Sequence, residues 1–217
     1  MHVHEQDPHF FALSFMLSAI NYLKVESILD IGSGTGRALT YIKEKHPQVS
    51  IIGVEPIKEL REVGYSQGLS RDDLIEGDAT ELEFNDRSFD LVCEFGVLHH
   101  IHHPERAVSE MLRVARKAIF ISDSNNFGQG SSLERMVKQV INALGLWNLV
   151  DLMKTRGKGY TLTECDGLAY SYSIFNNYRL IRKHCERIHM LNTGNGNANF
   201  YRTAGLVALL AIKKKGE

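Results

Sequence analysis

The chain has 217 residues, of which 43% are hydrophobic and 24% are charged. This composition is close to that of ordinary globular domains and excludes disorder as the main state. Lys and Arg together number 25 and Asp and Glu 26, so the charge balance argues against a broad nucleic-acid-binding surface. The length suits a single domain over residues 1–217 that needs no disulfide or metal to hold it together.

Three features predict a cytoplasmic protein without a membrane span. The first residues are polar and lack the basic and apolar regions of a signal peptide. The longest apolar run, Gly205–Ile212, is much shorter than the ~20 residues that a spanning helix needs. The cysteines Cys93, Cys165 and Cys185 are scattered and form no CxxC pair, a pattern that fits free thiols.

The first half of the chain alternates helix and strand patterns. Asp7-Pro8 is a helix start signal, and the apolar stripe after it predicts a helix over Phe10–Leu23. Short apolar runs then predict strands at Ser27–Ile31, Ser50–Val54, Leu74–Glu76, Phe89–Glu94 and Ala118–Ser122. Between them, helices are predicted over Arg37–His46, Lys58–Ser66 and Pro104–Ala115. This alternation indicates an α/β fold with a doubly wound, mainly parallel sheet covered by helices on both faces.

The alternation stops after Asp123. Strand patterns resume only at Arg187–Asn192 and Leu206–Lys213, which brings the expected sheet to seven strands. The sequence between them predicts one long helix over Leu133–Met153 and a second over Phe175–His184. We therefore expect residues 124–186 to form a helical cap inserted within the single domain.

The glycine-rich segment Asp30–Gly36 follows the first predicted strand. Its glycines, Gly32, Gly34 and Gly36, let a ligand approach the backbone closely, and such a turn usually serves a nucleotide. A dinucleotide-binding G-x-G-x-x-G pattern would need glycine at position 37, which is Arg37. The carboxylate of Asp30 suits a ligand with an ammonium group better than one with a pyrophosphate. A turn that only packs a helix is the alternative.

Two further carboxylates follow the next two predicted strands. Glu55 lies about 20 residues beyond the glycine segment, where a carboxylate can accept hydrogen bonds from both ribose hydroxyls. Asp78, in Gly77-Asp78-Ala79, can accept a hydrogen bond from the exocyclic amine of adenine. Each could instead be a solvated or capping carboxylate. Three carboxylates at the ends of successive strands together predict a nucleoside site.

These residues resemble the motifs of the class I S-adenosylmethionine-dependent methyltransferase family, in particular its small-molecule-type branch. The resemblance runs from Ile28 to Asp123 and lies in Asp30–Gly36, Glu55-Pro56, Gly77–Ala79 and Phe89–Ile101. The family's Pro-Gly-Gly-like turn before the fifth strand is shortened here, since Arg113–Ala118 runs straight on. We expect that departure to change a loop and leave the cofactor site.

The resemblance implies a Rossmann-like fold, S-adenosyl-L-methionine as cofactor and a role for each motif residue. The backbone of the glycine segment and Asp30 would hold the methionine part of the cofactor. Glu55 would bind its ribose. Pro56 or Ile57 would pack on the adenine, Asp78 and Ala79 would bind its amine edge, and Glu94 and Phe95 would lie beside the sulfonium. The implied cofactor-binding set is Asp30, Gly32, Ser33, Gly34, Gly36, Glu55, Pro56, Ile57, Asp78, Ala79, Glu94 and Phe95.

Histidines are concentrated in two places. The loop after the fourth strand holds His99, His100, His102 and His103. It offers no fixed helical face and no interleaved carboxylate or thiolate, so we expect no metal site. The N-terminal group of His2, His4 and His9 could form a lid, or could be a chance composition.

Methyl transfer from a sulfonium needs mainly an acceptor aligned in line and the exclusion of water. A general base is needed only where the acceptor must lose a proton, and His99, His100 and Asp123 are the candidates because each follows a strand end. The cap aromatics could form an apolar acceptor pocket or simply the core of the cap; they are Phe127, Trp147, Tyr160, Tyr170, Tyr172, Phe175 and Tyr178. Lys154, Arg156 and Lys158 could meet an anionic acceptor or form a solvated loop.

The predicted function is therefore methyl transfer from S-adenosylmethionine to a small-molecule acceptor, with optional help from a general base. One alternative is a nicotinamide-dependent oxidoreductase, against which Arg37, Asp30 and Asp78 count. Another is a non-catalytic cofactor-binding module of the same fold. The sequence predicts neither the acceptor nor the oligomeric state.

Overall fold

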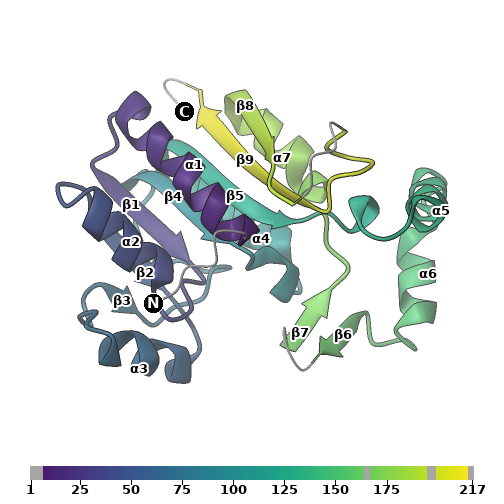
Figure 1. The fold of residues 1–217 in the computed structure, drawn as a ribbon, viewed down its shortest axis with the longest axis horizontal. Helices are drawn as coiled ribbons and strands as arrows, with labels where there is room; N and C mark the ends of the chain where they lie inside the picture. Colours follow the sequence, from purple (N-terminus) through teal and green to yellow (C-terminus); the bar gives the residue numbers. More distant parts are fainter. Residues whose placement is uncertain (1–6, 164–166, 195–198, 215–217) are drawn as a thin grey trace.

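A single seven-stranded sheet dominates the computed structural model, which describes residues 7–163, 167–194 and 199–214 (Figure 1). Its strands are β1 (Ser27–Ile31), β2 (Ser50–Val54), β3 (Leu74–Ile75), β4 (Phe89–Phe95), β5 (Ala115–Ser124), β8 (Cys185–Asn192) and β9 (Leu206–Lys213). They lie in the order β3-β2-β1-β4-β5-β9-β8. The first five are parallel, and β9 pairs antiparallel with both β5 and β8. The expected mainly parallel, doubly wound α/β fold is confirmed.

Helices cover both faces of this sheet. They are α1 (Pro8–Leu23), α2 (Arg37–Lys45), α3 (Lys58–Ser66), α4 (Pro104–Val114) and α7 (Tyr178–His184). Successive strand residues face opposite sides, so Ile28 packs in the core beneath α1 and α2, while Leu29 and Ile31 pack in the core beneath α4 and α7. Two apolar layers therefore fix the sheet from both sides.

Helix α1 begins as the sequence predicts. The side chain of Asp7 caps it by accepting hydrogen bonds from the backbone N–H groups of His9 and Phe10, which would otherwise lack partners. Leu13 and Met16 are buried against the sheet. This places His9 at the carboxyl end of β5, where its Nδ1 lies 3.1 Å from Ser122 Oγ. Of the N-terminal histidines, His2 and His4 lie outside the described residues.

The connection from α4 to β5 has no loop at all. Helix α4 ends at Val114 and β5 begins at Ala115, which confirms the shortened turn. The buried Lys213 Nζ donates hydrogen bonds to Leu112 O at 2.7 Å and to Ala115 O at 2.9 Å. Carbonyls at the end of a helix lack intrahelical donors. Because no turn follows α4 here, the ammonium group of Lys213 supplies the donors.

The cap differs from the expected long helix over Leu133–Met153. That segment breaks at Gly145, whose φ is +72°, into α5 (Ser132–Ala143) and α6 (Trp147–Lys154). The chain then forms a hairpin of β6 (Tyr160–Thr163) and β7 (Gly167–Tyr170) that the sequence analysis did not predict. In Figure 1, α5 and α6 stand beyond the end of the sheet, whereas α7 packs against α4.

The base of the cap depends on Asn125, a buried side chain just after β5. Its Nδ2 lies 3.0, 2.8 and 2.9 Å from the carbonyl oxygens of Phe200, Tyr201 and Ala204. We expect Asn125→Leu to lower the free energy of unfolding by about 2–4 kcal/mol, because buried carbonyls lose their donor. The exposed Asn176→Ala should change it by less than about 0.5 kcal/mol. Urea unfolding measures both, and equal values would show that Asn125 does not fix the cap.

Candidate functional site

The loops at the carboxyl ends of β1, β2 and β4 enclose a cavity of about 830 Å³, which we call the glycine-loop pocket. Its lining is Gly32, Gly34, Glu55, Pro56, Ile57, Leu60, Asp78, Ala79, Thr80, Phe95, Gly96, Val97, His100, Ile101, His102, His103, Arg106, Gly167 and Leu168. Parallel strands bring their carboxyl ends to one edge, where such folds bind ligands. Eight of the twelve expected cofactor residues line this pocket.

Glu55 ties the end of β2 to the glycine loop. It is 4% exposed, its Oε2 accepts a hydrogen bond from Gly34 N at 2.8 Å and its Oε1 from Ile57 N at 2.9 Å. The guanidinium of Arg61 donates hydrogen bonds to the backbone carbonyls of Glu55 and Pro56. Each carboxylate oxygen can accept a second hydrogen bond, so Glu55 both shapes the loop and offers acceptors to a ligand.

Gly32 and Gly34 are each needed in the loop for a different reason. A Cβ on Gly32 would lie 2.4 Å from a side-chain methyl of Val97, so this position permits close packing. Gly34 has φ +56° and nothing within 4 Å of a Cβ position, so its backbone borders open space. Gly36 does not line the pocket: it precedes α2, and a Cβ there would collide with Leu69.

The far end of the glycine-loop pocket combines an apolar surface with a carboxylate. Ile57 is 50% exposed although it is aliphatic, and it lines the pocket beside Pro56 and Ala79. Asp78 accepts hydrogen bonds from Thr80 N at 2.7 Å and Thr80 Oγ1 at 2.8 Å. The arrangement can take a flat ring whose edge carries a hydrogen-bond donor.

Two carboxylates at the ends of β1 and β4 are buried. Burial raises the pKa of Asp30 to about 7, and a thiol hydrogen bond from Cys93 opposes this weakly. Burial and the nearby Asp123 raise the pKa of Glu94 well above its ordinary value. Glu94 Oε2 accepts a hydrogen bond from Val97 N, whereas its buried Oε1 has no partner. Burial thus disfavours the ionised form of both groups, and a cation placed beside Asp30 would favour its ionised form again.

Asp30 and Ser33 face a small cavity of about 70 Å³ that also reaches His9, Arg37 and Phe95. Ser33 Oγ donates a hydrogen bond to Asp30 O at 2.8 Å. Phe95 borders both this cavity and the glycine-loop pocket, so the two spaces adjoin. Glu94 lines neither of them.

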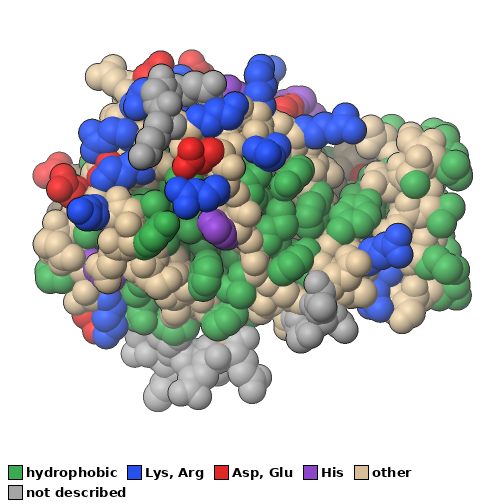
Figure 2. Space-filling model, turned by 90° about the horizontal axis from the view of Figure 1, so that it is seen from above, with side chains coloured by type: hydrophobic (Ala, Val, Ile, Leu, Met, Phe, Trp, Pro, Cys, Tyr) green, Lys and Arg blue, Asp and Glu red, His purple; other side chains and the backbone are tan. Residues whose placement is uncertain are grey.

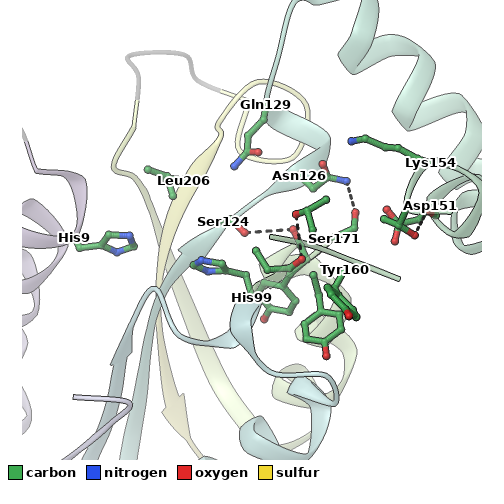
Figure 3. A pocket seen from close by; sticks show the side chains of 15 residues that line it. His9, His99, Ser124, Asn126, Gln129, Asp151, Lys154, Tyr160, Ser171 and Leu206 are labelled. Carbon is green, nitrogen blue, oxygen red and sulfur yellow. Dashed lines mark hydrogen bonds between the residues drawn. The ribbon is translucent and has the colours of Figure 1, made fainter. Parts of the chain in front are cut away.

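A second cavity of about 350 Å³, which we call the cap pocket, lies between the end of β5 and the cap (Figure 3). Its lining is His9, His99, Ser124, Asn126, Gln129, Asp151, Lys154, Thr155, Tyr160, Thr161, Ala169, Tyr170, Ser171, Tyr172 and Leu206. Asn126 Nδ2 donates to Ser171 Oγ at 2.9 Å. The walls are mainly hydroxyl, amide and charged groups, so the pocket is more polar than the aromatic pattern predicts.

Some of the cap aromatics line a pocket and others form the core of the cap, so each of the two alternatives holds for part of the set. Tyr160, Tyr170 and Tyr172 line the cap pocket. Phe127 and Trp147 pack edge-on with ring centroids 5.3 Å apart and form the core of the cap. Phe175 and Tyr178 line a separate hollow near β8.

His99 and Asp123 form a hydrogen-bonded pair at the cap pocket. His99 Nδ1 lies 2.7 Å from Oδ1 of the fully buried Asp123, whose Oδ2 also accepts from His99 N at 3.3 Å. The carboxylate therefore fixes the orientation of the imidazole. This is the arrangement of a general base with its orienting acid.

His100 lies on the other side, in the glycine-loop pocket. Its Nδ1 is 2.6 Å from Leu168 O of β7, and its ring centroid is 4.0 Å from that of His99. The short helix η1 (Leu98–His100) thus separates the two pockets and holds the hairpin. Among residues 7–163, 167–194 and 199–214, no three His, Cys, Asp or Glu side chains are grouped to hold a metal ion.

Several pocket residues were missed by the sequence analysis. Ser124 ends β5 and Asn126 and Gln129 follow it, and the polar run at this strand end is a signal that could have pointed to them. Asp151 and Ser171 had no such signal, because only the folded cap brings them together.

Residues 29–121 match the model of a family described as a methyltransferase domain. Phosphatidylethanolamine N-methyltransferase of Cereibacter sphaeroides is 32% identical over 54% of this chain and 61% of that protein. Demethylmenaquinone methyltransferase of Thermotoga maritima is 30% identical over 42% of this chain and 40% of that protein. The chain thus spans about two fifths to three fifths of the length of these curated relatives.

Solved structures share the fold over almost the whole chain. An S-adenosylmethionine-dependent methyltransferase of Thermotoga maritima, described as a possible histamine N-methyltransferase, has a TM-score of 0.57 at 20% identity and covers 95% of this chain and 92% of its own. Another, from Mesorhizobium loti, has a TM-score of 0.60 at 14% identity over 95% of this chain and 98% of its own. The fold is that of a Rossmann-like methyltransferase.

Together, the matching domain and the fold confirm the resemblance seen in the sequence. Residues 29–121 thus match a methyltransferase domain, and the fold around them is shared with S-adenosylmethionine-dependent methyltransferases, whose cofactor is S-adenosyl-L-methionine. The nicotinamide-dependent alternative finds no support in these comparisons. Over the described part of the chain, no helix is both long and apolar enough to cross a bilayer.

The buried Asp30 makes stability depend on pH. Its pKa is raised from 3.8 to about 7, so its contribution to stability is complete below pH 3.8 and is lost as the pH rises towards 7. The side chain of Asp30→Asn stays neutral at every pH. Without cofactor, the free energy of unfolding of this variant, taken relative to that of the parent, should therefore rise by up to about 4 kcal/mol from pH 4 to pH 8. Urea unfolding at both pH values measures this. The exposed Asp72→Asn should show no such change, and a flat difference for Asp30→Asn would contradict the prediction.

Proposed function

We propose that the whole protein transfers a methyl group from S-adenosylmethionine to a small-molecule acceptor. The observation that carries this proposal is the pair of adjoining sites on either side of η1. The glycine-loop pocket presents the carboxylate of Glu55, and the cap pocket presents the imidazole of His99. In this proposal residues 1–217 form one domain, and residues 124–186 supply the acceptor-binding cap.

The glycine-loop pocket fits the expected cofactor. The open space at Gly34 admits a ligand to the backbone, and the buried oxygens of Glu55 can accept from two ribose hydroxyls. The half-exposed Ile57 supplies an apolar surface for adenine. The small cavity beside this pocket places the buried carboxyl of Asp30 where it can meet the ammonium group of a ligand. When bound, the cofactor supplies an activated methyl group.

The protein's own groups then have three tasks. Glu55 and the glycine backbone bind and orient the donor, and the cap excludes water from the acceptor. His99 accepts a proton from an acceptor that must lose one, and Asp123 orients the ring and stabilises its charge. His100 contacts β7, so we assign it to positioning the hairpin and not to proton transfer.

The small size of the acceptor is supported by the cap pocket, whose volume of about 350 Å³ lies at the lower end of the range for small-molecule sites. The relatives are named for lipid and quinone substrates. We include the expected cytoplasmic location in this proposal; the buried thiol of Cys93 donates a hydrogen bond to Asp30, and Cys165 lies outside the described residues.

The cofactor assignment can be tested at Glu55. We expect Glu55→Gln to weaken the binding of S-adenosylhomocysteine roughly 10- to 100-fold, because the amide loses charge and one backbone hydrogen bond. Glu59→Gln, an exposed residue of α3, removes the same charge and should bind as the parent does. Titration calorimetry measures both, and equal affinities would remove Glu55 from the cofactor site.

The catalytic assignment can be tested at His99. An acceptor is first sought in a thermal-shift screen with S-adenosylhomocysteine present, since bound ligands raise stability. With that acceptor, His99→Gln should lower turnover about 10²- to 10⁴-fold and leave cofactor affinity within about twofold, as measured by mass spectrometry and calorimetry. His46→Gln, at a half-buried histidine that lines neither pocket, is the control.

Two outcomes would decide against the proposal. Full turnover by His99→Gln would exclude a general base there. Cofactor binding without methyl transfer to any acceptor would favour the non-catalytic module instead.

A further inference from the structure

Helix α5 is attached to the rest of the molecule by its polar face. Lys138 Nζ donates a hydrogen bond to Asn126 O. Gln139 Nε2 donates to the carbonyl oxygens of Phe127 and Arg202, at 3.0 Å each. The polar side chains of this helix therefore point inward, where an amphipathic helix usually places its apolar stripe.

The opposite side of α5 is apolar and exposed, and α6 continues it. Neither helix has a buried residue. Nine side chains between 46% and 72% exposed make up what we call the α5–α6 apolar face: Leu133, Met136, Val137, Val140, Leu144, Leu146, Leu149, Leu152 and Met153. On α5 they occupy positions i, i+3, i+4 and i+7, so they form one stripe. Figure 2 shows hydrophobic side chains along this end of the molecule.

An exposed apolar surface of this extent is unusual for a protein that works alone in water, and it marks a place of interaction. The polar attachment of α5 explains why the apolar stripe is not drawn into the core. The α5–α6 apolar face is therefore available to another surface.

The charge beside this face indicates what that surface is. Within residues 131–163, Lys138 is bonded inward and Lys154 lines the cap pocket, which leaves Arg135, Arg156 and Lys158 as the basic residues that can stand beside this face. Arg156 and Lys158, just beyond α6, are exposed. An anionic surface would attract these cations.

We propose that the α5–α6 apolar face docks on an anionic lipid bilayer. Leucine, valine and methionine side chains enter the boundary between headgroups and acyl chains, and the basic residues beside them meet lipid phosphates and carboxylates. The helices lie in the plane of the interface and do not cross the bilayer. The proposal does not depend on the methyltransferase activity, because docking is measured without substrate.

Co-sedimentation of the full chain with vesicles tests this proposal. We expect binding at least roughly tenfold stronger to mixed phosphatidylcholine–phosphatidylserine vesicles than to phosphatidylcholine alone, and weaker binding as salt is added. Arg156→Gln with Lys158→Gln should lower affinity for the mixed vesicles about 25-fold. The matched control, Arg179→Gln with Lys183→Gln, removes two exposed cations from α7 and should bind as the parent does.

A second variant tests the apolar part. Val140→Gln, Leu144→Gln and Leu149→Gln together should abolish vesicle binding, while Val63→Gln, an exposed apolar residue of α3, should not. Circular dichroism and calorimetry with S-adenosylhomocysteine confirm that each variant is folded.

Three results would overturn the proposal. The first is a parent chain that binds neither kind of vesicle. The second is equal binding by the parent and the charge variant. The third is a parent chain that is a dimer in sedimentation equilibrium while the apolar variant is a monomer, because a second copy of the chain would then cover the face.

Discussion

The two backbone hydrogen bonds that Glu55 accepts are the contacts on which the organisation of the site depends. They join the end of β2 to the glycine loop after β1 and to the start of α3, while Arg61 holds the carbonyls beneath. Because Glu55 is buried, its carboxylate is compensated chiefly by these fixed dipoles. Glu55 also lines the pocket. The same carboxylate therefore sets the shape of the loop and offers acceptors to hydroxyl groups of a ligand.

The chemistry of the site follows from how the chain divides the space beyond the sheet. Helix η1 lies between the glycine-loop pocket and the cap pocket, with His99 on one side and His100 on the other. His99 is fixed to the sheet by Asp123 and His100 to the cap by β7. The position of the cap is thereby linked to the position of the proposed base, although the two belong to distant segments of the chain.

Local patterns predicted the parts of the structure that local physics determines. The cap of α1, the parallel strands and the carboxylates at their ends follow from capping, alternation and spacing within short segments. The break at Gly145 and the β6–β7 hairpin were missed, because a glycine is tolerated within a helical pattern and the hairpin is held by tertiary contacts such as His100 with Leu168. The contact of Gly36 with Leu69 could not be predicted either, because Leu69 lies far along the chain.

Helix α6 has two different surfaces within a few residues of one another. Asp151, Lys154 and Thr155 line the cap pocket, while Leu149 and Met153 lie on the outward face. The width of a helix, about 10 Å, therefore separates the wall of the cap pocket, where we propose that the acceptor binds, from the face that we propose docks on lipid. An amphipathic acceptor dissolved in that leaflet would reach the enzyme by lateral, two-dimensional diffusion, and its local abundance in the membrane would set the rate of encounter.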